Sequence, residues 1–192
     1  MADVYLLEED MSEVIEVNFE TGGDSYFGVG RNATQNWTAV KFTIGAEILC
    51  SSASIYFDGV NGSPTGDLTF RIETDDGGEP SGDLAHANAT GTIANGDITQ
   101  PAWNKCSFTP LTLSADTYWL VCYIPDQGTE NNNWKWVRDN SQAGGVGSST
   151  DHGANWTIYN DDYYTYYRIY RSTTLFIDVH DCTDLVDKVI GG

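Results

Sequence analysis

The sequence predicts an all-β protein, an antiparallel β-sandwich of jelly-roll type. Apolar residues recur at every second position in many short segments, turn-forming residues separate these segments, and aromatic residues make up 12% of the 192 positions. A chain of this length is expected to form one domain with a core of its own. We expect an N-terminal arm and first strand over residues 1–24, the sandwich over 25–172, and a C-terminal strand and short helix over 173–192.

The first strand is predicted over residues 15–19, where apolar and polar side chains alternate after an arm over residues 1–12. Segments 38–44 and 49–57 follow with the same alternation, and each has one apolar face. We expect these faces to point into the core, because burial of apolar surface is the dominant favourable term in folding.

The middle of the chain predicts three further strands. Residues 68–72 alternate cleanly, and in the next segment Trp103 and Lys105 share one face while Cys106 lies on the other. Residues 116–125 are apolar at both parities, which is typical of a central strand buried on both faces.

Two cysteines flank a hairpin that is predicted around Ser114. Cys106 and Cys122 either face each other across this hairpin or are two separate buried thiols, as cysteines in apolar strands commonly are. The chain has 4 cysteines, too few for a disulfide scaffold, and their spacing fits no metal site.

The last third of the chain predicts strands over 134–138, 156–159, 165–170 and 174–179. A short helix is predicted after them, capped by Asp181 or Thr183. Its apolar face is expected to dock on the sandwich or on a neighbouring subunit, because a helix of two turns is not stable alone.

The charge of the chain excludes some classes of partner. Lys and Arg total 9 and Asp and Glu total 28, so the net charge is −19. Nucleic acid and anionic membrane surfaces are therefore not expected as partners. No signal peptide or membrane-spanning segment is visible, which predicts assembly in the cytoplasm of the host cell.

No catalytic site is predicted. The 3 histidines have no partner at metal-ligand spacing, and the sequence contains no nucleophile elbow, P-loop or dinucleotide fingerprint. We therefore expect a protein that is not an enzyme.

Calcium is the one cofactor that the composition suggests, because oxygen-rich loops of a sandwich can supply its ligands. The alternative is that acidic turns only keep the chain soluble. The candidate ligands are Asp58, Asn61, Asp67, Asp75 and Asp76.

Aromatic and cationic side chains near the C-terminal end form the candidate ligand-binding set. They are expected either to stack on sugar rings or anchor a protein interface, or only to cover the edges of the core. The set comprises Trp134, Trp136, Arg138, Trp156, Tyr166, Arg168 and Tyr170.

The order of features in four segments resembles that of the choice-of-anchor R domains and related sandwich modules of phage tail and virion proteins. The segments are VKFTIGAEILCSSASIYFDG, GSPTGDLTFRIETDDGGEPSGDLAHA, WNKCSFTPLTLSADTYWLVCYI and GANWTIYNDDYYTYYRIY. The resemblance covers residues 36–171. It implies a jelly-roll-like module that attaches to a larger assembly, and it carries no catalytic residues to this chain.

The expected function is that of a virion structural protein of a bacteriophage, a capsid decoration, tail or fibre subunit whose partners are other virion proteins and copies of itself. Apolar residues of the terminal segments are expected to hold this homo-oligomer together. They are Leu6, Leu7, Val14, Leu185, Val186 and Ile190. The alternative is an extracellular carbohydrate-binding module with a structural calcium, or a virion protein that also binds a host surface glycan.

Overall fold

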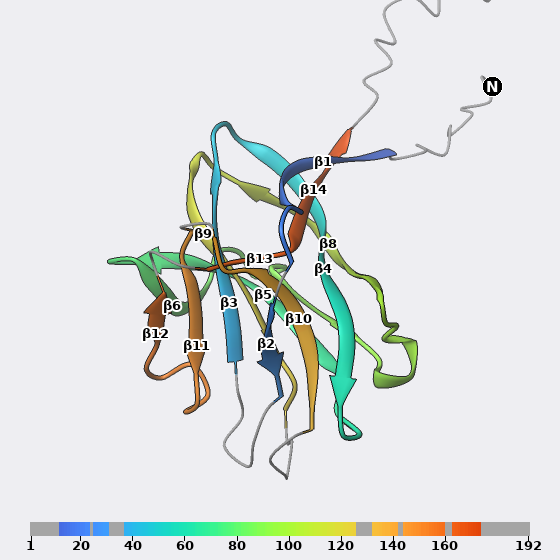
Figure 1. The fold of residues 1–192 in the computed structure, drawn as a ribbon. Helices are drawn as coiled ribbons and strands as arrows, with labels where there is room; N and C mark the ends of the chain where they lie inside the picture. The colour runs from blue at the N-terminus through green and yellow to red at the C-terminus, as the bar shows by residue number, and fades with distance from the viewer. Residues whose placement is uncertain are drawn as a thin grey trace, which may run out of the picture.

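The computed structural model confirms the antiparallel β-sandwich (Figure 1). It describes residues 12–23, 25–30, 37–125, 132–141, 144–159 and 163–173. The described residues form two antiparallel sheets, here called sheet A and sheet B, which pack face to face around one core. The arm that precedes Ser12, the strand predicted over 174–179 and the predicted C-terminal helix lie outside the described residues.

Sheet A contains the strands that begin and end the described chain. Its order is β1 (Ser12–Phe19), β14 (Tyr167–Thr173), β4 (Ile48–Asn61), β10 (Asn133–Asp139) and β13 (Tyr164–Thr165), with β2 (Ser25–Val29) paired to β10 and β8 (Ala102–Leu113) paired to β4. The long strand β4 pairs with β14 through its first half and with β10 through its second half. This arrangement leaves β1 at the edge of the sheet.

Sheet B contains the central strand that the sequence predicts. Its order is β12 (Thr157–Tyr159), β11 (Val146–Ser149), β3 (Trp37–Ile44), β9 (Asp116–Tyr123), β5 (Leu68–Asp76) and β6 (Glu79–Leu84), with β7 (Thr90–Ile93) paired to β5 and followed by a 3-10 helix over Asn95–Asp97. β9 lies between β3 and β5, and it is buried on both faces. Leu120 faces the core and Trp119 faces away from it, yet both are 0% exposed.

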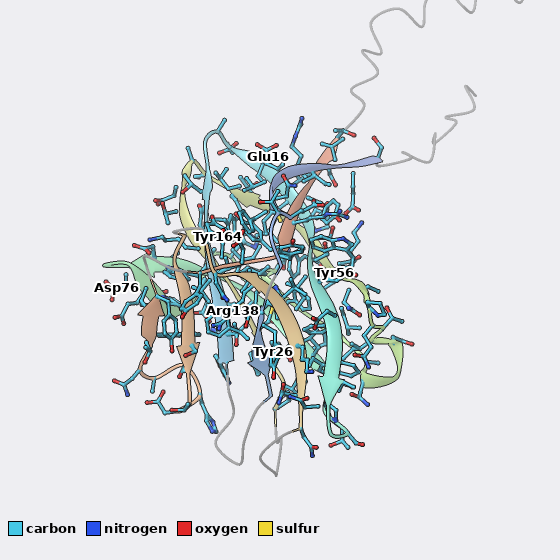
Figure 2. All side chains as sticks on the ribbon, in the orientation of Figure 1. Glu16, Tyr26, Tyr56, Asp76, Arg138 and Tyr164 are labelled. Carbon is cyan, nitrogen blue, oxygen red and sulfur yellow. The ribbon has the colours of Figure 1, made fainter. Side chains whose placement is uncertain are left out.

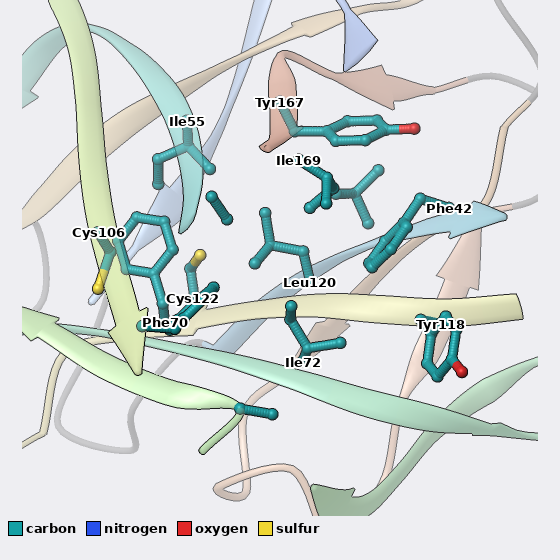
Figure 3. Packing of buried hydrophobic residues seen from close by; sticks show 14 of the residues in the cluster. Phe42, Ile55, Phe70, Ile72, Cys106, Tyr118, Leu120, Cys122, Tyr167 and Ile169 are labelled. Atoms are coloured by element: carbon teal, nitrogen blue, oxygen red, sulfur yellow. The ribbon is translucent and has the colours of Figure 1, made fainter. Parts of the chain in front are cut away.

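The core consists of the alternating apolar faces that the periodicity predicts, except that a register shift between Cys50 and Ser52 places Cys50 in the core instead of Leu49. In Figure 3, Phe42, Ile72 and Leu120 of sheet B meet Ile55 and Ile169 of sheet A. All five side chains are buried. Each such side chain contributes about 1.5–3 kcal/mol to folding relative to an exposed position, so this layer holds the sheets together.

The hairpin predicted around Ser114 does not form as a pair of hydrogen-bonded strands. β8 pairs with β4 in sheet A and β9 pairs with β3 and β5 in sheet B, so the chain crosses between the sheets at this turn. Cys106 and Cys122 are free, buried thiols on opposite sheets (Figure 3). The prediction of two separate buried thiols is the correct one.

The described chain starts and finishes at one corner of the sandwich. β1 runs antiparallel to β14, and Ser12 lies opposite Thr173. Figure 1 shows these two strands leaving the sheet side by side. Two segments that are 161 positions apart in the sequence therefore join the sandwich at the same place.

Candidate functional site

The predicted ligand-binding set does not form one cluster, and only its last three members share a surface. Tyr166, Arg168 and Tyr170 lie on the outer face of sheet A, at or beside β14, and they are half-buried. The alternate residues Tyr167 and Ile169 point into the core, as the sequence predicts.

Two tryptophans of the set are core residues, which corrects the expectation that their rings stack on a ligand. Trp136 is 0% exposed and Trp134 is 8% exposed. β10 is paired on both sides, and the strand face with the largest apolar side chains fills the interior while Lys135 points outward. The indole of Trp136 donates a hydrogen bond to the carbonyl oxygen of Tyr166 at 2.7 Å, which satisfies its only polar group.

The remaining two members lie elsewhere. The Arg138 guanidinium is packed between Phe27 and Tyr163, with its central carbon 4.5 and 4.2 Å from the two ring centres. Trp156 is half-buried on the outer face of sheet B, where it packs on the cluster around Trp119. Neither side chain adjoins the surface that carries Tyr166.

Three strands of sheet A join their outward side chains into one surface, which we call the outer aromatic face. It consists of Tyr56, Trp103, Lys105, Tyr166, Arg168 and Tyr170. Figure 2 shows Tyr56 on the β4 side of the molecule. In the sheet register Tyr56 lies opposite Trp103 on β8, and its backbone N–H donates to the carbonyl of Tyr166 at 3.4 Å.

The rings of this face are in mutual contact. The centroid of Tyr56 lies 5.5 Å from that of Trp103 and 6.2 Å from that of Tyr166. Trp103 and Tyr166 are nearly parallel, with an interplanar angle of 18°. The Arg168 guanidinium lies 3.8 Å from the Trp103 ring centre, and the Lys105 ammonium lies 4.5 Å from that of Tyr170. Such contacts between cations and rings fix the rotamers of both partners.

Glutamates of the β1 segment border the outer aromatic face and neutralise its cations. Glu20 accepts two hydrogen bonds from Arg168, at 2.6 and 2.7 Å, and these bonds hold the pKa of Glu20 below its ordinary value. Glu13 pairs with Lys105 and also accepts from the hydroxyl of Ser51 at 2.6 Å. Burial raises the pKa of Glu13, but its hydrogen bonds outweigh this effect and the net shift is downward.

The sequence predicts only half of this face. The alternation in 103–108 already places Trp103 and Lys105 opposite Cys106, and Tyr56 alternates with Ile55. The missing information is the pairing of β8 with β4 and of β4 with β14, which brings these positions together with Arg168. Long-range pairing of this kind cannot be deduced from the periodicity of one segment.

The predicted calcium ligands serve other purposes or lie apart. Asp75 accepts from the indole of Trp119 at 2.7 Å and from the backbone N–H of Gly78 at 3.0 Å, and Asp67 accepts from the N–H of Asn95 at 2.9 Å. Asp58 lies within β4, Asn61 ends β4 and Asp76 ends β5, and Figure 2 shows Asp76 on the side of the molecule opposite Tyr56. Nowhere in the described part of the chain do three or more His, Cys, Asp or Glu side chains gather as metal ligands.

One predicted assembly residue can be placed. Val14 on β1 is 38% exposed, beside Ile15 at 44%. In the described sheet order no strand pairs with the outer edge of β1, so these apolar side chains accompany unpaired backbone groups. Leu6, Leu7, Leu185, Val186 and Ile190 lie outside the described residues.

The outer aromatic face offers flat rings and paired charges, a combination that suits the faces and hydroxyl groups of sugars or an aromatic protein contact. The thiols of Cys50, Cys106 and Cys122 lie in the core between the two sheets. Burial raises the pKa of Cys50 and of Cys106 to about 12, so neither is a ready nucleophile.

Comparison with known proteins adds no relative: no family model and no curated protein matches the chain. No helix within the described ranges is long and apolar enough to cross a membrane.

Proposed function

We propose that this chain is a non-enzymatic structural protein of a bacteriophage virion, a capsid decoration, tail or fibre subunit. In this proposal the protein assembles in the host cytoplasm with copies of itself and with other virion proteins. The corner where β1 and β14 meet is the attachment end, and the rest of the sandwich is displayed to solvent.

The observation that carries the proposal is the pairing of β1 with β14. Because Ser12 lies opposite Thr173, the segments before and after the sandwich join it at one corner and can reach the same neighbour. A module fastened by both of its terminal segments suits a subunit that is added to a larger particle. The resemblance to virion sandwich modules agrees with this arrangement.

The edge of β1 supports the proposal at the level of contacts. Val14 and Ile15 are two of the three large apolar side chains that are exposed among the described residues. Burial of such residues, together with those of the terminal segments, supplies the apolar core that stable homo-oligomers need. The mechanism is therefore burial of apolar side chains between adjacent subunits.

The solution mass of the purified full-length chain tests the proposal. Light scattering is expected to give a defined oligomer. A variant with Leu185, Val186 and Ile190 all replaced by Asp is expected to be a monomer with an unchanged circular dichroism spectrum. The matched control is Tyr26→Asp, which alters a side chain 38% exposed on β2, away from the β1–β14 corner, and should leave the mass unchanged.

A full-length chain that stays monomeric at every concentration would contradict the proposal. An oligomer whose mass does not change in the triple Asp variant would count against a role of Leu185, Val186 and Ile190 in holding the subunits together.

The outer aromatic face favours a second function, the binding of a glycan, which a virion protein can combine with assembly. Trp103 and Tyr166 have nearly parallel rings 6.4 Å apart, with the Arg168 guanidinium over the Trp103 ring at 3.8 Å, and stacking on sugar rings uses half-exposed aromatic surfaces of this kind. A glycan array is expected to give saturable binding that Trp103→Ala abolishes, whereas Tyr26→Ala retains it. An array without any specific signal would remove this second function.

A further inference from the structure

A groove of 770 Å³ lies beside the β1–β14 corner, between the two sheets. β1 contributes Val17 and Asn18 to its wall, β3 contributes Lys41, Phe42 and Thr43, and the remaining lining comes from Gly144, Gly145, Tyr164 and Tyr167. Figure 2 shows Tyr164 at the centre of this side of the molecule. The groove is not part of the outer aromatic face, and no strand of the two described sheets occupies it.

Both long borders of the groove are strand edges without a strand partner. β1 is the first strand in the order of sheet A, so its far edge is unpaired within the described residues. β3 is paired with β11 only over Trp37–Val40, and one more bond, from the N–H of Lys41 to the carbonyl of Gly145 at 2.9 Å, ends the contact.

Gly145 explains why the edge of β3 opens at this point. Its φ of 73° turns the chain away from β3, and a Cβ there would lie 2.8 Å from Cε of Lys41. Backbone groups of a strand point to alternate sides, so the N–H and carbonyl of Thr43 face the same side as those of Lys41. They therefore face the groove.

These borders define the kind of ligand that fits. An extended peptide strand can hydrogen-bond to a free edge and place alternate side chains in a groove. The half-buried ring of Tyr164 lines the floor and stacks on Tyr167 at 5.9 Å, and Phe42 lies 6.2 Å from Tyr167, both of these last two rings being 2% exposed. Lys41 is the one charged residue in its described lining, and its ammonium lies on the outer side of sheet B, 5.6 Å from the ring centre of Trp119. The groove thus suits an apolar strand that carries a single acidic residue.

We propose that residues 174–179 of a neighbouring copy, Thr-Leu-Phe-Ile-Asp-Val, occupy this groove as an added strand. The segment alternates Leu175, Ile177 and Val179 at strand spacing, and its only charge is Asp178, which complements Lys41. The segment before β1, residues 1–11, contains four acidic residues and no cation, so it suits this lining less well.

Geometry makes the donor a second copy. β14 ends at Thr173, opposite Ser12, whereas the groove adjoins β1 at Val17. To return to Val17 within the same copy, the chain must first turn around the end of β1 and then cover five residues, about 17 Å at 3.4 Å per residue. Residues 174–179 would then form the connection and could not also fill the groove. From another copy they can enter the groove directly.

This inference deepens the proposed assembly function and rests on it. The test is cross-linking of full-length chains in which Cys182 is replaced by Ser. One variant carries Thr43→Cys on the outer side of sheet B, where the native hydroxyl contacts that of Thr117. Three others carry Thr174→Cys, Phe176→Cys or Asp178→Cys, the positions that face the same side when Leu175, Ile177 and Val179 face the groove. The Thr43 variant is mixed with each of the others and oxidised. The buried thiols of Cys50, Cys106 and Cys122 are not expected to react.

A covalent dimer is expected in at least one of the three mixtures, and it should be lost when Lys41→Glu is added to the Thr43→Cys variant. The matched control uses Thr112→Cys, an exposed position on β8, which should give no dimer.

A cross-link that forms only when both cysteines are in one chain would overturn the donor assignment, as would a cross-link from Leu7→Cys in place of the three C-terminal positions. No cross-link in a protein that light scattering shows to be oligomeric would reject this groove while the assembly function stands. A monomeric protein without a cross-link would reject both.

Discussion

Trp136 and Trp103 are both tryptophans of sheet A, but their environments differ. Trp136 is fully buried and its indole is hydrogen-bonded to Tyr166, whereas Trp103 is half-buried on the outer aromatic face. We expect Trp136→Ala to lower the free energy of unfolding by about 3–5 kcal/mol, because it leaves a large cavity. Trp103→Ala should cost about 1 kcal/mol. Denaturation by urea measures both, and equal losses would contradict the placement of the two rings.

The ion pair of Glu20 with Arg168 makes the stability of the folded chain depend on pH. The hydrogen bonds from Arg168 lower the pKa of Glu20 in the folded state, so its contribution to stability is present above the pKa of the unfolded chain, about 4.3. It is lost as the pH falls through the lower folded value.

The stability of the wild-type chain should therefore fall below about pH 4.3 more steeply than that of Glu20→Gln. Urea denaturation at pH 3 to 7 measures the difference. Arg168→Gln should reduce the pH dependence of the free energy of unfolding by the same amount. Parallel stability profiles for the wild type and Glu20→Gln would show that this ion pair does not contribute to the pH dependence.

At the scale of elements, β9 and β1 are opposites in their pairing. β9 is flanked by β3 and β5 and buried on both faces, whereas β1 is paired only with β14 among the described strands. In the monomeric state we expect the amide of Leu120 to exchange its hydrogen far more slowly than those of Val14 and Ile15. Hydrogen exchange followed by mass spectrometry tests this, and equal rates in β1 and β9 would contradict it. Protection of β1 should rise when the subunits assemble.

The same two strands show how far sequence alone can go. The apolar pattern at both parities of 116–125 predicts a doubly buried strand, and the alternation of apolar and polar residues over 15–19 predicts β1, because both signals lie within one segment. The bulge between Ile15 and Val17, which turns Ile15 away from the core, leaves no such signal. The partners of a strand do not leave such a signal. The crossing between β8 and β9, and the meeting of Trp103 with Arg168, depend on pairings between distant segments.

Trp134 and Trp136 illustrate the second limit. A strand with large aromatics on one face has the same pattern whether that face binds a ligand or fills the core. The pairing of β10 on both of its sides, and the core that lies beneath it, decide the question in favour of burial.

At the scale of the whole molecule, the charge of −19 opposes association of like copies. Among the described residues, the cations of the β1–β14 region are already paired within the chain, Lys105 with Glu13, Arg168 with Glu20 and Arg171 with Glu16 at 2.8 Å. Contacts between copies at this corner must therefore be mainly apolar, and they must overcome repulsion between the acidic surfaces.

Added salt should strengthen the assembly, because the range of repulsion shrinks from about 30 Å at 0.01 M to about 8 Å at 0.15 M ionic strength while apolar contacts are retained. Light scattering is expected to show a mass that rises over this range. Val14→Asp, which adds a charge and removes an apolar side chain on the edge of β1, should keep the mass low at both concentrations. A mass that falls as salt is added would mean that ion pairs between copies hold the assembly, and the apolar mechanism would have to be abandoned.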